Sequence, residues 1–395
     1  MKEVYIADGV RTPIGRMGGA LAPFRPEELA AFALKGLLDK TKIDPAIVAD
    51  ILVGHACTNN AAVNIARWAA LKAGFPVSVT AQTVERQCGS SLQTVNTAAA
   101  FIRAGFGEVY IAGGCESWSN APYLMERQKT PYSLAPNAFI TREVGPTAET
   151  NTPMGIVAEI LAEEWQISRE EQDRFALRSQ TSAIRAIEAG YFREETVPVV
   201  IPQRKGDPVV FDRDEHPRAT TPEKLAALSP AFKKGGTVTA GNSSGLNDGA
   251  VALLLASAER CAALGLKPLG RFVACALAGV EPKYMGIGPA FAVPKALAAA
   301  GLTLEQMDVV ECNEAFAAQT LAVMKELAKQ GHRIEPERWN PNGGAIAFGH
   351  PNGMSGGRLV LAVLHELHRT GGRYGLATLC IGGGQGIATI FERLS

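Results

Sequence analysis

Hydrophobic and polar positions follow two alternating periods along the first part of the chain. The apolar residues of Glu3–Gly9 (EVYIADG) are grouped as in a buried strand. Those of Glu27–Lys40 recur at the spacing of an amphipathic helix. Ala49–Ala56 (ADILVGHA) then predicts a second strand, and residues 61–73 a second helix. Strands that alternate with helices in this way favour an α/β fold whose sheets are covered by helices.

The same order of patterns occurs again in the C-terminal part of the chain. Lys42–Ala56 and Gly301–Ala315 each read as a turn, a short helix, an aspartate and an apolar strand, with a helix before and after. A helix-like run and a strand follow Cys88, and the same pair follows His350. The match is in pattern more than in identity. It predicts two similar halves that pack as a pseudo-dimer and bring corresponding loops to one shared site.

A segment rich in proline and charge separates the two halves, from Trp118 to about Asp248. It contains one strongly amphipathic helical stretch, Met154–Gly190, and the strand GAVALLLAS then resumes the first half. We therefore expect an inserted loop, or lid, domain. The predicted division is residues 1–118 for the N-terminal half, 119–248 for the inserted domain, 249–270 for the end of the N-terminal half and 271–395 for the C-terminal half.

The composition of the chain mainly excludes classes of partner. The 39 Lys and Arg residues balance 39 Asp and Glu residues, so no basic surface predicts a nucleic-acid partner. No apolar run approaches the roughly 20 residues that a membrane helix needs, and the early first strand leaves no room for a leader. We expect a cytoplasmic protein without a membrane partner, and the hydrophobic share of 47% favours an oligomeric interface.

The seven cysteines are scattered along the chain without a CxxC pair. An odd and widely spaced set argues against a disulfide framework and against a zinc ribbon, and we expect no bound metal. Core packing and catalysis remain as the two explanations for these thiols.

Cys88 stands between the apolar run Val77–Val84 and the helix-like run Leu92–Ile102. The N-terminus of a helix is positive and favours a thiolate over a thiol. Gly89 would let another molecule approach the backbone closely. The alternative is a core cysteine at a tight turn, where the thiol serves only as a small apolar side chain.

Three further stretches place polar groups beside glycine or at the end of a strand. Asn313 and Glu314 end an apolar strand and enter a helix, where polar side chains often act only as caps. His350 alone among the six histidines lies in a glycine-dense loop, NPNGGAIAFGHPNGMSGGR. Cys380 ends a buried strand before three glycines, whose N–H groups are candidates for an oxyanion hole.

Seven motifs together carry a resemblance to a known family. They are QCGSS, GGCES, MGIVAE, GTVTAGNSSGLNDGA, NEAFA, GGAIAFGHPNG and CIGGGQG, in that order. Over essentially its whole length the chain resembles the thiolases, which are acyl-CoA:acetyl-CoA C-acyltransferases of fatty acid metabolism. The resemblance implies duplicated βαβαβαββ halves in a layered α-β-α-β-α core with an inserted lid. It also implies acyl-CoA and CoA as substrates, no permanently bound cofactor, and a homo-oligomer, either a dimer or a tetramer.

The resemblance also implies a role for each chemical group. Cys88 is similar to the family's acyl-carrying nucleophile, and His350 to the histidine that takes the proton of this thiol. Asn313 would hold a water that, with His350, donates to the thioester oxygen. Cys380 matches the second acid or base, which moves the proton at the α-carbon of the substrate. The N–H groups of Cys88 and Gly382 match an oxyanion hole for the acyl-enzyme carbonyl.

Three residues match family positions that contact the substrate. Ser244 of AGNSSG is similar to a serine that touches the pantetheine arm of CoA, and Arg218 to a basic residue near the adenine. Met154 matches the methionine of a His-Met pair that the biosynthetic acetoacetyl-CoA members of the family have in one wall of the pocket.

Three positions depart from the family's pattern. Pro153 replaces the histidine of that His-Met pair, Asn352 stands where many members have an apolar residue, and Trp118 stands where methionine is usual. The catalytic groups are intact, so these departures concern the preferred acyl group.

Other interpretations of the same residues are a β-ketoacyl synthase, a non-catalytic acyl-CoA or lipid binder, and a hydrolase with a Cys-His pair. A synthase pairs its cysteine with two histidines, whereas the partners here are one histidine and one cysteine. A non-catalytic relative would be expected to lose Cys88 or His350, and both are present.

Overall fold

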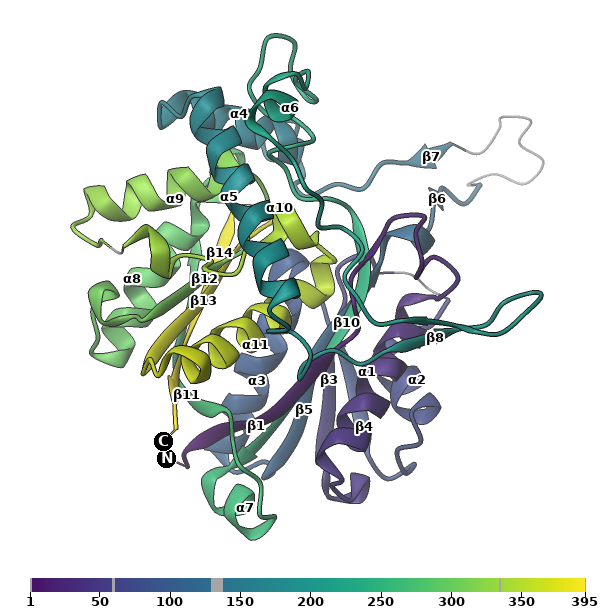
Figure 1. Cartoon of the computed structure of the whole chain (residues 1–395). Coiled ribbons are helices and arrows are strands. Elements are labelled where there is room, and N and C mark those ends of the chain that lie inside the picture. The colour runs from purple at the N-terminus through teal and green to yellow at the C-terminus, as the bar shows by residue number, and fades with distance from the viewer. Residues whose placement is uncertain (1, 59–60, 129–137, 334, 395) are drawn as a thin grey trace.

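The computed structural model describes residues 2–58, 61–128, 138–333 and 335–394 (Figure 1). Within these ranges, ten strands join in one large sheet, and short strands form two small ones. The large sheet contains β1 (Val4–Arg11), β2 (Gly15–Arg16), β3 (Asp50–Gly54), β4 (Thr80–Val84), β5 (Val109–Ser117), β10 (Asn247–Ser257), β11 (Gly270–Gly279), β12 (Val309–Cys312), β13 (Tyr374–Ile381) and β14 (Gln385–Arg393). The small sheets pair β6 (Leu124–Met125) with β7 (Phe139–Ile140) and β8 (Val199–Ile201) with β9 (Val209–Phe211).

The α-helices of the described residues lie on both sides of the large sheet and in the segment between β5 and β10. They are α1 (Pro26–Thr41), α2 (Ile65–Lys72), α3 (Ser90–Ala104), α4 (Met154–Glu164), α5 (Arg169–Glu188), α6 (Pro222–Ala226), α7 (Ala258–Ala263), α8 (Gly288–Ala300), α9 (Ala317–Lys329), α10 (Ala345–Phe348) and α11 (Asn352–Thr370).

The large sheet consists of two similar halves that meet at one edge. From β1 outward the order is β1-β10-β5-β3-β4, and from β11 outward it is β11-β14-β13-β12. A parallel bridge between Val310 and Trp339 stands where the second half would have its fifth strand. The halves join through two residue pairs, Tyr5 with Arg271 and Ile6 with Gly270. The repeated strand order confirms the duplication expected from the sequence.

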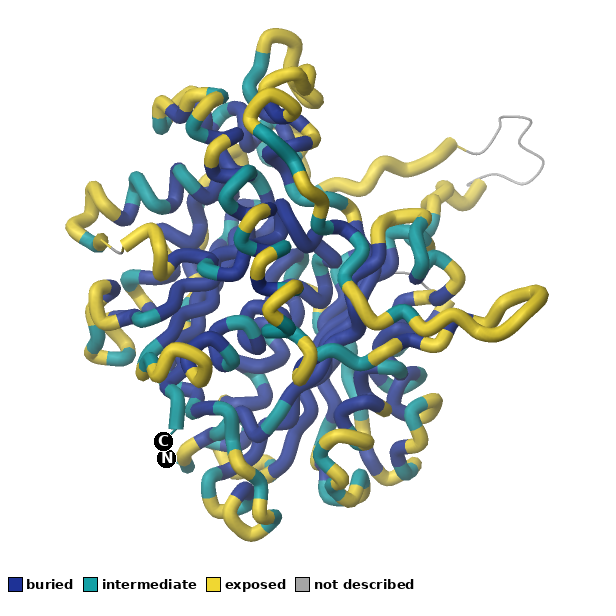
Figure 2. Tube along the Cα trace, in the orientation of Figure 1, coloured by how far each residue is buried: buried dark blue, intermediate teal, exposed yellow. Residues whose placement is uncertain are grey.

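Among the described residues, buried side chains form three large cores and two small clusters. Figure 2 shows that the buried residues lie in the interior of the molecule and the exposed ones mainly at its periphery. One core lies between α1, α2 and the first half of the sheet, and another between α8, α9 and the second half. The central core holds α3 and α11 between the two halves, with Leu92 and Leu361 among its members. The layering is therefore α-β-α-β-α, as the resemblance implied, and it places the N-termini of α3 and α11 together.

The segment between β5 and β10 differs from the sequence prediction in one respect. The single amphipathic stretch is divided into α4 and α5, because Gln166 adopts a φ of 49° and ends the first helix. Ser168 then caps the second helix, since its hydroxyl accepts from the Glu171 N–H while the Glu171 carboxylate accepts from the Ser168 N–H. The predicted domain boundaries at 118 and 248 stay predictions; β5 ends at Ser117 and β10 begins at Asn247.

The second predicted helix starts four residues later than expected. The side chain of Asn64 accepts a hydrogen bond from the Arg67 N–H at 3.0 Å and so caps α2 at Ile65. Among the helices described, none combines the length and the apolar character needed to cross a membrane.

Candidate active site

Cys88 lies in the connection between β4 and α3. One turn of 3-10 helix, Gln87–Gly89, holds it, and α3 begins at Ser90. Gln87 adopts a φ of 44°, an unusual conformation for a residue with a side chain, and it turns the chain sharply before the thiol. A Cβ at Gly89 would lie 2.7 Å from Cδ1 of Ile381. Only glycine therefore lets this turn pack against the second half.

Cys88 is 9% exposed, and its sulfur lies among hydrogen-bond donors. Nδ2 of Asn352 donates to it at 3.2 Å, and the Gly382 backbone amide is also within hydrogen-bonding reach. Burial raises the pKa of the Cys88 thiol, and these donors offset only part of that increase. The sequence predicted a larger thiolate fraction from the helix terminus; burial reverses the direction, so the resting group is a thiol.

His350 is held as a neutral imidazole whose Nε2 atom carries no proton. Nδ1 lies 2.6 Å from Oγ of Ser355, whose own proton goes to the Pro351 carbonyl at 3.1 Å. Nδ1 is therefore assigned the proton and donates it to Ser355. Burial, together with the positive charge of Arg358, lowers the pKa of His350 to about 3.

Two amides face the Nε2 atom of His350. Nδ2 of Asn313 and Nδ2 of Asn352 each lie 3.4 Å from it. The His350 backbone N–H is fixed by the Gly245 carbonyl at 3.2 Å and by Oδ1 of Asn247 at 3.1 Å. His350 is thus positioned by residues at the start of β10, directly after β12 and in the first turn of α11.

Asn313 and Glu314 do not cap the following helix, so that interpretation of their position is wrong. Helix α9 begins only at Ala317, with Phe316 at the N-cap position. Asn313 faces His350 instead, and the buried Glu314 carboxylate accepts from Ser179 Oγ at 2.6 Å and Asn340 Nδ2 at 2.8 Å. Strand β12 ends before the helix starts, and this gap lets both side chains turn inward.

Cys380 and Gly382 come from the end of β13 and the turn to β14. Cys380 is 1% exposed, and burial raises its pKa well above the ordinary value, with the nearby sulfurs of Cys88 and Cys312 acting in the same direction. Gly383 and Gly384 adopt φ values of 80° and 85°, which close the turn beside Cys88. Two thiols from the two halves therefore share one buried site.

A cavity of about 480 Å³ opens onto Cys88. Met154, Trp118, Asn352 and Gly382 are part of its lining, and so is the exposed Arg142. Met154, which was predicted to form a wall of the pocket, therefore lines the same cavity as Cys88.

Ser244 and Arg218 are not among the lining residues of this cavity. The Ser244 N–H donates to the Ala315 carbonyl at 3.0 Å, and the next residue, Gly245, holds His350. Arg218 is exposed, and its guanidinium lies 3.4 Å from the Ala240 carbonyl. Ser244 is therefore near His350, whereas Arg218 lies further along the same segment.

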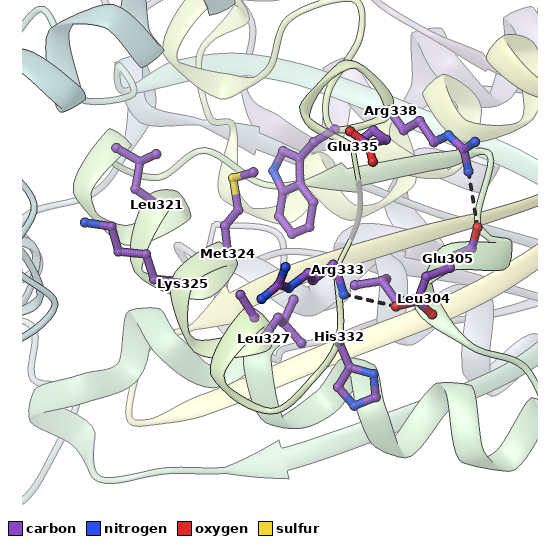
Figure 3. Close-up of a pocket in the computed structure, with 12 residues that line it drawn as sticks. Leu304, Glu305, Leu321, Met324, Lys325, Leu327, His332, Arg333, Glu335 and Arg338 are labelled. Atoms are coloured by element: carbon purple, nitrogen blue, oxygen red, sulfur yellow. Dashed lines mark hydrogen bonds between the residues drawn. The ribbon is translucent and has the colours of Figure 1, made fainter.

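A larger cavity of about 610 Å³ lies elsewhere, against α9 (Figure 3). Leu304, Met324, His332 and Arg338 belong to its lining, and it contains none of the predicted site residues. The larger of these two cavities is therefore not the one that contains the candidate catalytic residues.

Three residues of the site were not identified from the sequence. Ser355 sets the tautomer of His350, Asn247 holds its backbone, and Glu116 accepts hydrogen bonds from backbone N–H groups of three residues. All three lie inside quoted stretches, Ser355 in NPNGGAIAFGHPNGMSGGR, Asn247 in GTVTAGNSSGLNDGA and Glu116 in GGCES, and this position was the available signal.

The fold joins two similar halves around a buried site that contains two thiols and a histidine, and comparison with known proteins identifies the family. The family model described as "Thiolase, N-terminal domain" matches residues 4–259, and "Thiolase, C-terminal domain" matches residues 266–393. The chain belongs to the thiolase family.

Named relatives match the chain over its full length. It is 48% identical over 397 residues to an acetyl-CoA acetyltransferase of Pseudomonas aeruginosa, with 100% of each chain covered. It is also 48% identical over 406 residues to the 3-oxoadipyl-CoA/3-oxo-5,6-dehydrosuberyl-CoA thiolase of Escherichia coli, again with 100% of each covered.

Solved structures match the fold as closely. The Bacillus anthracis acetyl-CoA acetyltransferase gives a TM-score of 0.94 at 45% identity, covering 100% of this chain and 99% of that one. Human mitochondrial 3-ketoacyl-CoA thiolase in complex with CoA gives 0.92 at 39% identity, covering 100% and 98%.

Proposed function

We propose that this thiolase transfers an acyl group between CoA thioesters through an acyl-Cys88 intermediate. It would cleave a 3-oxoacyl-CoA with CoA, or condense two acyl-CoA molecules in the reverse direction. The observation that carries the proposal is the meeting of Cys88, His350 and Cys380, from both halves of the chain, in one buried site.

The first half-reaction loads the acyl group onto Cys88. The thiol proton passes to Nε2 of His350, the sulfur attacks the thioester carbonyl, and CoA leaves as a thiol with that proton. The carbonyl oxygen gains charge during the attack, and the backbone N–H groups of Cys88 and Gly382 are the donors proposed to stabilise it. Neutral His350 is suited to accept the proton because its Nδ1 already carries one.

The second half-reaction in the condensing direction forms the carbon–carbon bond. Cys380 is proposed to pass its thiol proton to Nε2 of His350, and the thiolate so formed removes a proton from the α-carbon of acetyl-CoA and becomes a thiol again. The resulting carbanion attacks the acyl-Cys88 carbonyl, Cys88 leaves as a thiolate that takes the proton back from His350, and the product is a 3-oxoacyl-CoA. The enolate oxygen is proposed to receive hydrogen bonds from His350 and a water on Asn313, whose buried Oδ1 has no partner among the described residues.

The CoA contacts come from the segment between β5 and β10. We assign Ser244 to the pantetheine arm, Arg218 to the adenine end and Met154 to the pocket wall. CoA and acyl-CoA would be substrates, with no permanently bound cofactor. The human mitochondrial relative has been solved in complex with CoA, and this supports the assignment of CoA as a substrate here.

A homo-oligomer, either a dimer or a tetramer, forms the second part of the proposal. Strands β6 and β7 extend away from the body of the molecule (Figure 1). Apolar side chains on and beside these strands are exposed: Phe139 of β7 is 69% exposed, and Tyr123, directly before β6, is 88% exposed. Such a projecting apolar surface is typical of a protein–protein contact.

Incubation with acetyl-CoA tests the function directly. We expect acetoacetyl-CoA to form, and its thiolysis by CoA to proceed in the opposite direction, while a Cys88→Ser variant does neither. A panel of 3-oxoacyl-CoA substrates of increasing length, with 3-oxoadipyl-CoA included because of the Escherichia coli relative, would define the acyl group. Release of CoA without a ketone product would instead indicate a thioesterase, and absence of turnover a binding protein.

A further inference from the structure

Two residues that depart from the family's pattern are joined to each other and to the nucleophile. Nε1 of Trp118 donates to Oδ1 of Asn352 at 2.7 Å, and Nδ2 of Asn352 donates to the Cys88 sulfur at 3.2 Å. Among the described residues, the side chain of Asn352 alone is hydrogen-bonded to both Cys88 and His350.

The indole of Trp118 determines which end of the Asn352 amide faces the thiol. An indole N–H can only donate, so the amide oxygen must face Trp118 and the NH₂ group must face Cys88 and His350. The NH₂ group lies closer to the sulfur, at 3.2 Å, than to Nε2 of His350, at 3.4 Å, although sulfur is the larger atom. Its stronger hydrogen bond therefore goes to the sulfur.

We propose that Asn352 is a catalytic residue that stabilises the thiolate of Cys88, and that Trp118 is the positioning residue that fixes its amide. The proposal rests on the proposed function, since it concerns the ionised form of the acyl carrier. A hydrogen bond to a charged acceptor is worth more than one to its neutral form, so the donor favours transfer of the thiol proton to His350. The same donor stabilises Cys88 again when it leaves as a thiolate.

The Asn352 donor reduces the free-energy cost of forming a buried thiolate at Cys88. Burial disfavours the thiolate, and in the described structure no lysine or arginine forms an ion pair with the sulfur. The Asn352 side chain and the Gly382 backbone amide offset part of this effect. Because the Gly382 amide is also needed by the substrate carbonyl, Asn352 is the donor that can stay with the sulfur throughout the attack.

The pH dependence of Cys88 alkylation by iodoacetamide tests the proposal in the full-length protein. The rate is read from the labelled Cys88 peptide by mass spectrometry, which separates it from the six other cysteines. Asn352→Leu removes the donor at similar volume, and we expect a higher apparent pKa and about a tenfold slower reaction at pH 7. Trp118→Phe keeps an aromatic ring and removes the N–H, with an expected decrease of about threefold.

Thr58→Val is the matched control, because Thr58 lines the same cavity and has no hydrogen bond to the sulfur. Its alkylation profile should coincide with that of the unaltered protein. An unchanged or lower Cys88 pKa in Asn352→Leu would overturn the proposal, and Trp118→Phe gives an independent result if the first variant does not fold. Acetylation of Cys88 by acetyl-CoA in the unaltered protein tests the proposed function separately. A failure of the Asn352 proposal can therefore be distinguished from a failure of the proposed function.

Discussion

At the scale of single residues, burial sets the protonation state of the site. It raises the pKa of Cys88 and of Cys380, and with Arg358 it lowers the pKa of His350 to about 3. The resting groups are therefore two thiols and a neutral imidazole. No ion pair has to be broken when a thioester enters, and the charged pair forms only as the Cys88 proton moves to His350.

The surroundings of the Asn313 side chain suit it to hold a water that donates a hydrogen bond to the substrate oxygen. Its NH₂ group faces Nε2 of His350, and its Oδ1 is buried without a partner among the described residues. A buried acceptor without a partner is costly. A water that bridges to the substrate oxygen would satisfy it, which agrees with the role that the family resemblance implied.

At the scale of elements, one buried carboxylate connects three segments around the site. Glu116, on β5, accepts from the N–H groups of Ala56 and Cys57 after β3 and of Gly353 in the first turn of α11. Its Oε1 also lies 3.0 Å from Nδ1 of the buried His55. Burial opposes the charge on His55, but hydrogen bonds to Cys115 and Glu116 outweigh it and raise the pKa of His55 to about 11.

We predict that Glu116→Gln lowers the free energy of unfolding by about 3 kcal/mol, because it leaves the buried His55 cation without its partner. The folded pKa of His55 is above the unfolded value of 6.5. The stability from this pair is therefore fully present below pH 6.5 and is lost as the pH rises toward 11. Urea unfolding should show a smaller difference between variant and parent at pH 9 than at pH 6.

The control for this prediction is Glu108→Gln, which removes a surface ion pair with Lys2. Exposed pairs of this kind contribute at most about 1 kcal/mol. A pH-independent effect of Glu116→Gln, or one no larger than that of Glu108→Gln, would contradict this account of the carboxylate.

At the scale of the whole molecule, the site exists only because the two halves pack against each other. Cys88 lies two residues before the start of α3, α11 begins two residues after His350, and β13 carries Cys380. The crossing of α3 and α11 is very close at Gly356, where a Cβ would lie 2.5 Å from the Leu92 backbone nitrogen. The distance between the halves therefore depends on a glycine.

We predict that Gly356→Ala destabilises the protein by about 2 kcal/mol or more, because the clash is with backbone that cannot move aside. Helix propensity alone predicts the opposite, since alanine in a helix is favoured over glycine by roughly 1 kcal/mol. Gly279→Ala is the control, because a Cβ at Gly279 would have nothing within 4 Å and the φ of this residue is not positive. Equal stability of the two variants in urea unfolding would show that the helix crossing does not set this distance.

The sequence predicts the parts of this structure that depend on local pattern. The period of apolar residues and the repeated order of motifs are enough for the α/β class, the duplication and the neighbourhood of Cys88. The break between α4 and α5 depends on a single residue, Gln166, with a positive φ that no periodicity reveals. The inward turn of Asn313 and the net effect of burial on Cys88 depend on tertiary contacts from both halves, so local pattern could not predict them.

The central claim is that Cys88 carries the acyl group while Cys380 moves the proton at carbon. Acetyl transfer to Cys88 breaks no C–H bond, so a Cys380→Ala variant should still load it, although its condensation rate should fall by a factor on the order of 100 or more. The most direct measurement is the mass of the Cys88 peptide after this variant has been mixed with acetyl-CoA and digested in acid. We expect an acetyl group on Cys88; an unmodified Cys88, or a label on another cysteine only, would contradict the account.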